Sequence, residues 1–174
     1  VVFLGGATAA DIRRSIDQTR AEAVALGRAP DSIRFISGVT VITAATDAQA
    51  EARFREYLAV ADQEAALVLF SAWTGIDWSA YPLDPPLEYI ETNAIRSALA
   101  NFTRIDADKR WTLGEIARYI AIGGLHPVFV GGPRKVADAL EAYADAAGVD
   151  GFNVAYAVSP GTLADFVPHL TPEL

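Results

Sequence analysis

The chain has 174 residues, which is enough for one domain or for a large part of a bigger one. Its 8 Phe, 6 Tyr and 3 Trp can build a hydrophobic core, and with no Cys and 2 His the composition excludes a disordered chain, a disulfide framework and a His-rich metal cluster. The formal net charge of −8 is unfavourable for binding nucleic acid or an anionic membrane, so neither partner is expected.

The first part of the chain alternates between strand and helix patterns. Residues 1–4 are all apolar, which is typical of a strand covered on both faces in a parallel sheet. Thr8 is the expected N-cap of the first helix, and Gly27 is expected to end it. The β-branched stretch 33–42 predicts a second strand, and Thr46 is the expected cap of the helix that follows.

Residues 62–125 interrupt this alternation. We expect helices at 64–72, 93–105 and 113–122, the last of them capped by Thr112 with Glu115, and an irregular stretch at 73–87 that contains three Pro. A long irregular stretch inside a compact fold is usually functional. Residues 62–125 are therefore predicted to be an insertion with a lid-like aromatic segment.

Three aromatic residues, Trp73, Trp78 and Tyr81, stand out in the irregular stretch. They could line a pocket for a flat or apolar ligand. The alternative is that they pack the insertion against the rest of the fold, as most aromatic side chains do. Both interpretations stay open from the residues alone.

Alternation returns after the insertion. A strand is expected at 128–130, and Pro133 suits the first turn of the next helix. The last strand is expected at 151–156, and Thr162 is expected to cap the terminal helix through its spacing to Asp165. The carboxyl ends of such strands gather site residues in barrel enzymes, which favours Asn153 and Tyr156 as site residues.

Two further features have less specific patterns. Gly131-Gly132-Pro133 could bind a phosphate at a helix N-terminus, but it lacks the spacing of phosphate-binding loops, and a tight turn is the alternative. His126 and His169 are interpreted as exposed or structural residues rather than catalytic bases.

Strands that alternate with helices predict a parallel sheet, with the strands adjacent in chain order. Such units make half of a (β/α)₈ barrel, whereas a doubly wound open sheet would also fit the length. The sequence begins with an apolar strand and without Met, which favours the half-barrel and indicates a piece of a longer protein.

Several motifs occur in a characteristic order. They are Val1-Val2-Phe3, Trp73-Thr74-Gly75-Ile76-Asp77 with Tyr81-Pro82-Leu83-Asp84, residues 128–133 with Val136-Ala137-Asp138, and Gly151-Phe152-Asn153 with Ser159-Pro160-Gly161. Together they resemble the C-terminal part of the luciferase-like flavin monooxygenases. Within that family the pattern is most similar to the nitrilotriacetate, dibenzothiophene-sulfone and long-chain alkane monooxygenase group, and it covers essentially the whole chain.

The resemblance implies an α/β fold, a TIM (β/α)₈ barrel of the bacterial luciferase type. Residues 1–174 would be roughly its C-terminal half, with the helical insertion at 62–125. It also implies a cytoplasmic two-component enzyme that oxidises a small organic substrate with O₂. Reduced FMN (FMNH₂) would come from an NAD(P)H-dependent flavin reductase, and a homo-oligomer is expected.

The resemblance also implies site residues. Phe3, Trp73, Thr74, Tyr81 and Tyr156 are expected to bind substrate, and Phe3, Trp73 and Tyr156 are expected to converge in one cavity. Among cofactor contacts only Asn153 is expected within this chain, because the family's flavin-phosphate residues precede the strand at 1–4. No catalytic residue and no metal ligand is assigned.

Trp73 departs from the pattern, since relatives often have a His there. This departure favours the alternative function of a non-catalytic flavin- or ligand-binding relative, and a third reading is an open-sheet α/β domain unrelated to flavin.

Overall fold

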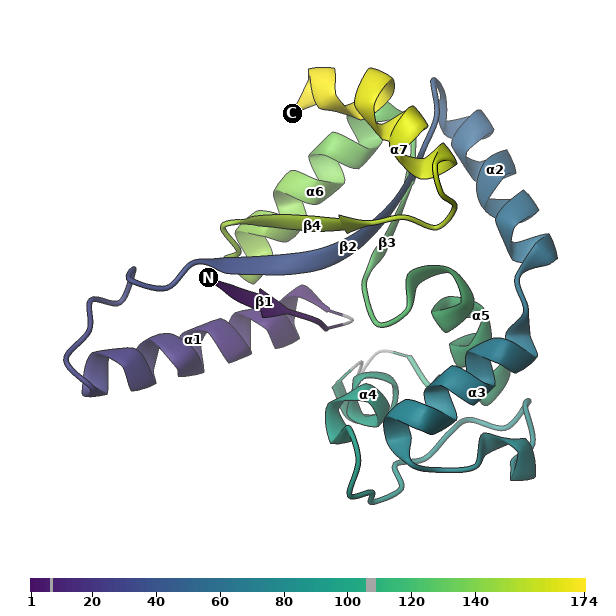
Figure 1. Cartoon of the computed structure of the whole chain (residues 1–174), viewed down its shortest axis with the longest axis horizontal. Helices are drawn as coiled ribbons and strands as arrows, with labels where there is room; N and C mark the ends of the chain where they lie inside the picture. The colour runs from purple at the N-terminus through teal and green to yellow at the C-terminus, as the bar shows by residue number, and fades with distance from the viewer. Residues whose placement is uncertain (7, 106–108) are drawn as a thin grey trace. The chain divides into compact units, whose positions relative to one another are not determined.

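The computed structural model describes residues 1–6, 8–105 and 109–174 (Figure 1). Its described part divides into two compact units. The first unit contains residues 1–54 and 126–174, and the second contains residues 55–125. No described helix is both long enough and apolar enough to span a membrane.

The first unit is built on a parallel sheet. Its strands are β1 (Val2–Leu4), β2 (Phe35–Thr43), β3 (Val128–Gly131) and β4 (Gly151–Ala155). Every described pairing involves β2, which pairs in parallel with β1, β3 and β4. The predicted strands and their parallel direction are therefore confirmed, and β2 is the centre of the sheet.

The predicted order of the strands is wrong at β4, which pairs with β2 and not with β3. The backbone shows why an edge of β2 is available. Arg34 accepts a hydrogen bond from β1 and Thr40 donates one toward β3, so β1 and β3 follow one another along the same edge. Phe35 accepts from Asp150 on the other edge. Alternate residues of a strand bond to opposite sides, so β4 takes the edge that the two short strands leave.

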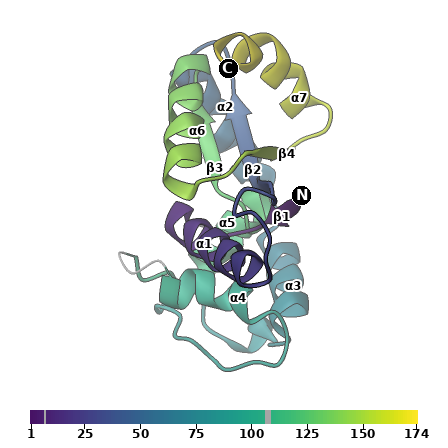
Figure 2. The same cartoon turned by 90° about the vertical axis from the view of Figure 1, so that its left-hand side faces the viewer.

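Helices α1 (Ala9–Ala25) and α6 (Pro133–Ala147) are neighbours that cover one face of the sheet (Figure 2). Phe35 packs there with Ile12, Ile16 and Tyr143. The helices begin as predicted, because Thr8 accepts a hydrogen bond from the Asp11 N–H at 3.2 Å and Pro133 lies in the first turn of α6.

The remaining helices of this unit follow β2 and β4. Helix α2 (Asp47–Val60) begins in the first unit and continues into the second. After β4 come α7 (Gly161–Asp165), the π-helical turn η3 (Phe166–Leu170) and the 3₁₀ turn η4 (Thr171–Glu173). Leu170 of η3 packs on the same sheet face as α6, against Val39 and Val41 of β2.

The predicted cap of the terminal helix is wrong. Thr162 lies inside α7, and its hydroxyl accepts hydrogen bonds from the backbone N–H groups of Ala157 and Val158, both at 3.1 Å. These two amides follow β4 and lack a strand partner in the pairings described. The hydroxyl therefore forms hydrogen bonds with the loop backbone and does not cap the helix.

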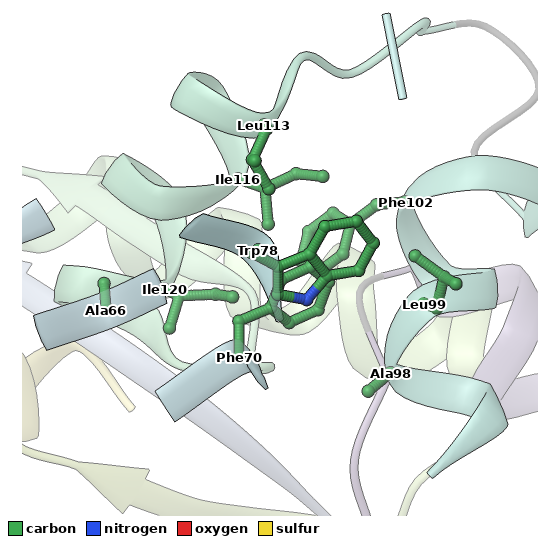
Figure 3. Packing of buried hydrophobic residues seen from close by; sticks show 9 residues of the cluster. All are labelled: Ala66, Phe70, Trp78, Ala98, Leu99, Phe102, Leu113, Ile116 and Ile120. Atoms are coloured by element: carbon green, nitrogen blue, oxygen red, sulfur yellow. The ribbon is translucent and has the colours of Figure 1, made fainter. Parts of the chain in front are cut away.

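The second unit is helical. It contains α3 (Gln63–Thr74), the 3₁₀ turn η1 (Trp78–Ala80), α4 (Arg96–Ala100), the π-helical turn η2 (Asn101–Ile105) and α5 (Leu113–Gly123). Figure 3 shows its core, in which Trp78 lies between residues of α3, α4 and α5. The predicted capping box of α5 is present, with Thr112 and Glu115 bonded to each other's backbone N–H.

The predicted start of the irregular stretch is wrong by two residues. Trp73 and Thr74 form the last turn of α3, and Gly75 ends that helix with a left-handed φ of 69°. A residue with a Cβ is strained at this φ, so Gly75 determines where the helix ends. The apolar pattern alone predicted an end two residues too early.

Candidate functional site

The sheet of the first unit has a second face, opposite α1 and α6. In β1, Val2 and Leu4 pack into the helix-covered core, so Phe3 points the other way and is 69% exposed. In β4, Phe152 and Val154 pack into the same core, so the exposed Asn153 also points away from it. Phe3 and Asn153 therefore lie on the same face of the sheet.

The pairing register places these two side chains on either side of β2. Phe3 pairs with Ile36, and Asn153 pairs with Gly38. Ile36 and Gly38 alternate with residues that face the helices, so they belong to the second face as well. The Phe3 ring and the Asn153 amide thus lie on strands that flank β2. Together they can offer both apolar contact and hydrogen bonds to a flat ligand.

His126 lies against this face, two residues before the start of β3. An ideal Cβ on Gly38 would stand 2.4 Å from the His126 Cε1 and Nδ1 atoms, so the imidazole occupies the space that a side chain on Gly38 would need. Burial lowers the pKa of His126 and favours its neutral form. His126 was expected to be an exposed or structural residue, and its contact with this face was not predicted. The available signal was a glycine inside a β-branched strand, which marks a close approach.

Tyr156 follows the last residue of β4 and is 64% exposed. The loop that carries it is fixed by Thr162, whose hydroxyl binds the next two backbone N–H groups. Helix α7 is in turn tied to α2 by an ion pair between Asp165 and Arg53. Arg53 also donates to the Thr43 carbonyl at 3.3 Å, at the carboxyl end of β2. The position of Tyr156 is thus linked to the carboxyl ends of the strands.

The Gly131-Gly132-Pro133 turn is a tight βα turn. The Asp47 carboxylate accepts the Gly132 N–H at 2.6 Å, and the Thr43 hydroxyl donates to the Gly131 carbonyl at 2.9 Å. The N–H that would attract a phosphate already has an anionic partner. The phosphate-binding alternative is therefore unfavourable here, because a second anion would be repelled.

The predicted substrate residues of the second unit occupy different environments. Trp73 is half-buried and packs against the core of that unit. Thr74 is buried, and its hydroxyl donates to the Phe70 carbonyl at 2.7 Å and accepts from Trp78 Nε1 at 2.8 Å. Trp78 is fully buried and stacks on Phe70 at a centroid distance of 5.2 Å. Trp78 therefore packs into the core of the second unit, as the second interpretation of the aromatic residues expects, and it is also among the residues that line a cavity of that unit.

Tyr81 is 39% exposed and lines a cavity of about 330 Å³ in the second unit. Phe3 and Tyr156 belong to the first unit and Trp73 belongs to the second. The convergence of these three rings stays a prediction. Within the described residues, no group of three or more His, Asp or Glu side chains is arranged to hold a metal ion.

Comparison with known proteins gives matches along nearly the whole chain. The family model described as luciferase-like monooxygenase matches residues 1–151. The dimethyl-sulfide monooxygenase of Hyphomicrobium sulfonivorans is 46% identical over 162 residues, which cover 93% of this chain and 34% of the relative. The long-chain alkane monooxygenase of Geobacillus thermodenitrificans is 31% identical, over 99% of this chain and 35% of the relative. The chain therefore spans about a third of the length of these curated relatives.

Solved structures share the fold. The crystal structure of DmoA from Hyphomicrobium sulfonivorans superposes with a TM-score of 0.83 at 43% identity, covering 99% of this chain and 36% of the other. The crystal structure of riboflavin lyase, with a modified FMN and riboflavin as substrate, gives a TM-score of 0.81 at 33% identity, covering 99% of this chain and 37% of the other.

Proposed function

This chain belongs to the luciferase-like monooxygenase family, and on that premise we propose that the protein containing it is a flavin-dependent monooxygenase. The family and the luciferase-type α/β fold expected from the motifs are both confirmed. The alternative of an open-sheet domain from an unrelated family is wrong. The observation that carries the proposal is the 46% identity to a dimethyl-sulfide monooxygenase across 93% of the chain.

The proposed substrate is a small apolar organic molecule, such as an alkyl sulfide. Three observations support this class. The relative with 46% identity is named as a monooxygenase of dimethyl sulfide. The exposed side chains Phe3 and Tyr156 offer apolar contact area at the sheet of the first unit. The net charge of −8 would also repel a polycarboxylate substrate.

The described residues fit part of a flavin. The exposed amide of Asn153 can donate and accept hydrogen bonds at the edge of a planar ring. The Gly131-Gly132 turn does not fit a phosphate, because the Asp47 carboxylate occupies its N–H. We propose that the phosphate is bound by residues of the complete protein other than this turn.

This chain's own residues would orient the substrate and exclude water. When bound, reduced FMN would supply the two electrons that activate O₂, so that one oxygen atom enters the substrate and the other leaves as water. Phe3, Trp73, Tyr81 and Tyr156 would present apolar surface that keeps water from the reacting groups. Thr74 would act through Trp78, which it holds by a hydrogen bond of 2.8 Å.

The proposal includes the partners expected from the family resemblance. An NAD(P)H-dependent flavin reductase would supply reduced FMN, and the protein would act in the cytoplasm as a homo-oligomer. The competing function is a flavin-binding relative that does not oxygenate, and Trp73 in place of a His favours it.

An oxygenation assay on the full-length protein separates the two functions. The protein is mixed with NADH, FMN, a flavin reductase and dimethyl sulfide under ¹⁸O₂. We expect O₂ consumption above the rate without substrate, loss of dimethyl sulfide, and one ¹⁸O atom in a product. Nitrilotriacetate serves as the anionic control and should give the background rate. Tight flavin binding without substrate-dependent O₂ consumption would favour the non-catalytic alternative.

A further inference from the structure

The second unit contains a cavity of about 330 Å³ between α3, the η1 segment and α5. Its lining residues are Gln63, Glu64, Leu67, Trp78, Ser79, Tyr81, Leu83 and Ala117. The side chains of Leu67, Trp78, Tyr81, Leu83 and Ala117 are apolar or aromatic, and the polar residues Gln63 and Glu64 come from the start of α3. Binding sites for small molecules have this size and this composition, with mostly apolar walls and few polar groups.

The cavity is preformed because its walls are held by contacts outside it. Trp78 stacks on Phe70 and donates its indole N–H to Thr74. The Leu83 carbonyl accepts the backbone N–H of Gly114 at 3.0 Å, which fixes the loop to α5. A ligand would therefore lose little free energy in ordering the walls.

The exposed apolar surface at this cavity gives the binding its driving force. Tyr81 is 39% exposed and Leu83 is 45% exposed, and both belong to the lining. A ligand that covers them removes apolar surface from water. The Glu64 carboxylate at the cavity repels anions, so the ligand is not an acid.

We propose that this cavity binds a small uncharged apolar molecule, the size of one aromatic ring or a short alkyl chain. An apolar cavity of about 150 Å³ already accepts benzene, so a volume of about 330 Å³ is sufficient. The inference concerns binding to the second unit. The cavity shares Tyr81 with the residues expected to bind substrate, but binding would occur without flavin or O₂ and is tested separately from the proposed oxidation.

The probe for this site is fluorobenzene, and binding to the full-length protein is followed by ¹⁹F NMR. The wild-type protein should give a saturable change of the fluorine signal. Ala117→Leu places extra methyl groups in the cavity and should weaken binding at least about tenfold. Because Ala117 is buried, a larger side chain there can also disturb folding, so a second variant tests the same cavity. Leu83→Asp changes a residue that is 45% exposed and places a carboxylate at the cavity, and it should weaken binding by a similar factor.

Val68→Leu is the matched control, because Val68 is on α3 but is 66% exposed and does not line the cavity. It should bind fluorobenzene like the wild type. Circular dichroism checks that each variant is folded. If Ala117→Leu does not fold, Leu83→Asp alone tests the proposal. Two results would overturn the proposal: no saturable signal in the wild type, or wild-type affinity in the folded variants, which would place the probe elsewhere. The oxygenation assay is a separate measurement, so failure of one proposal does not imply failure of the other.

Discussion

At the scale of single residues, Gly38 determines what can lie on the second face of the sheet. The His126 ring occupies the space of the missing side chain, at 2.4 Å from an ideal Cβ. Such a distance does not occur between real atoms, so any side chain at residue 38 must displace the ring or the strand. This contact also explains why a glycine is tolerated in the middle of a buried strand.

We expect Gly38→Ala to destabilise the full-length protein by about 1–3 kcal/mol, the usual range for overpacking. Urea denaturation measures the change. Gly5→Ala is the matched control, since its Cβ would lie 3.8 Å from the same ring, which is an ordinary contact. The double variant Gly38→Ala/His126→Ala should recover part of the loss. If the double variant is no more stable than Gly38→Ala, the clash is not with His126.

At the scale of elements, Asp150 ties the start of β4 to the start of β2. Its carboxylate accepts the Phe35 backbone N–H at 2.9 Å and an Arg34 N–H at 2.6 Å, which holds the start of β4 beside the start of β2. The Phe35 N–H, followed by Arg34, lowers the pKa of Asp150. Folding therefore favours the ionised carboxylate.

The stability that Asp150 provides should depend on pH. Because the pKa is lower in the folded state, the contribution is complete above the unfolded value of about 3.9 and is lost as the pH falls through the folded value. We expect Asp150→Asn to be less stable than the wild type at pH 7 and to approach it as the pH falls below the lowered, folded-state pKa of Asp150. Urea denaturation at a series of pH values tests this. A constant difference across the series would show that the ionised form is not involved.

The loop after β4 is a second element fixed by one side chain. Thr162→Val removes the acceptor of two backbone N–H groups, and we expect a loss of about 1–3 kcal/mol in stability. Because the same loop carries Tyr156, we expect KM for the substrate to rise more than kcat falls. Thr162→Ser keeps the oxygen and should restore both quantities. A loss for Thr162→Ser as large as that for Thr162→Val would contradict this account, because serine keeps the hydroxyl that accepts the two N–H groups.

Local sequence patterns predicted most of the helices and strands, but they did not predict which strands pair with each other. The caps at Thr8 and Thr112, Pro133 in the first turn of α6, and the apolar strands all depend on neighbours in sequence, so the pattern was sufficient. The pairing of β4 with β2 depends on the lengths of two other strands, and no local pattern records it. Gly75, directly after Thr74, is the residue from which the end of α3 could have been predicted.

The candidate site was predicted in part for the same reason. Alternation along β1 and β4 is enough to place Phe3 and Asn153 away from the helices. The contact between His126 and Gly38 joins residues far apart in the chain, and it needs coordinates to be seen. Whether Trp78 lines a pocket or packs depends on Phe70 and Thr74, which the sequence does not identify as its partners.

At the scale of the whole molecule, the chain corresponds to about a third of its curated relatives. Val1 and Phe3 are 81% and 69% exposed, and Tyr156 is 64% exposed, which is unusual for large apolar side chains at a sheet. We expect residues 1–174 alone to bind a hydrophobic dye and to aggregate, whereas the full-length protein should not bind the dye and should not associate beyond a defined oligomer. Dye fluorescence and light scattering of the two proteins test this. A monomeric fragment without dye binding would show that its apolar surface needs no further cover.

Trp73 tests whether both units contribute to one substrate pocket. Phe3 and Tyr156 come from the first unit and Trp73 from the second, and the family resemblance predicts that they meet around the substrate. Removing an indole that contacts the substrate deletes apolar contact area without touching the flavin. We therefore expect Trp73→Ala in the full-length enzyme to raise the KM for dimethyl sulfide at least about tenfold, with an unchanged Kd for FMN. Val68→Ala, a truncation on the exposed side of the same helix, should leave both constants at their wild-type values. A weaker affinity for FMN with an unchanged KM would instead assign Trp73 to the flavin side of the pocket.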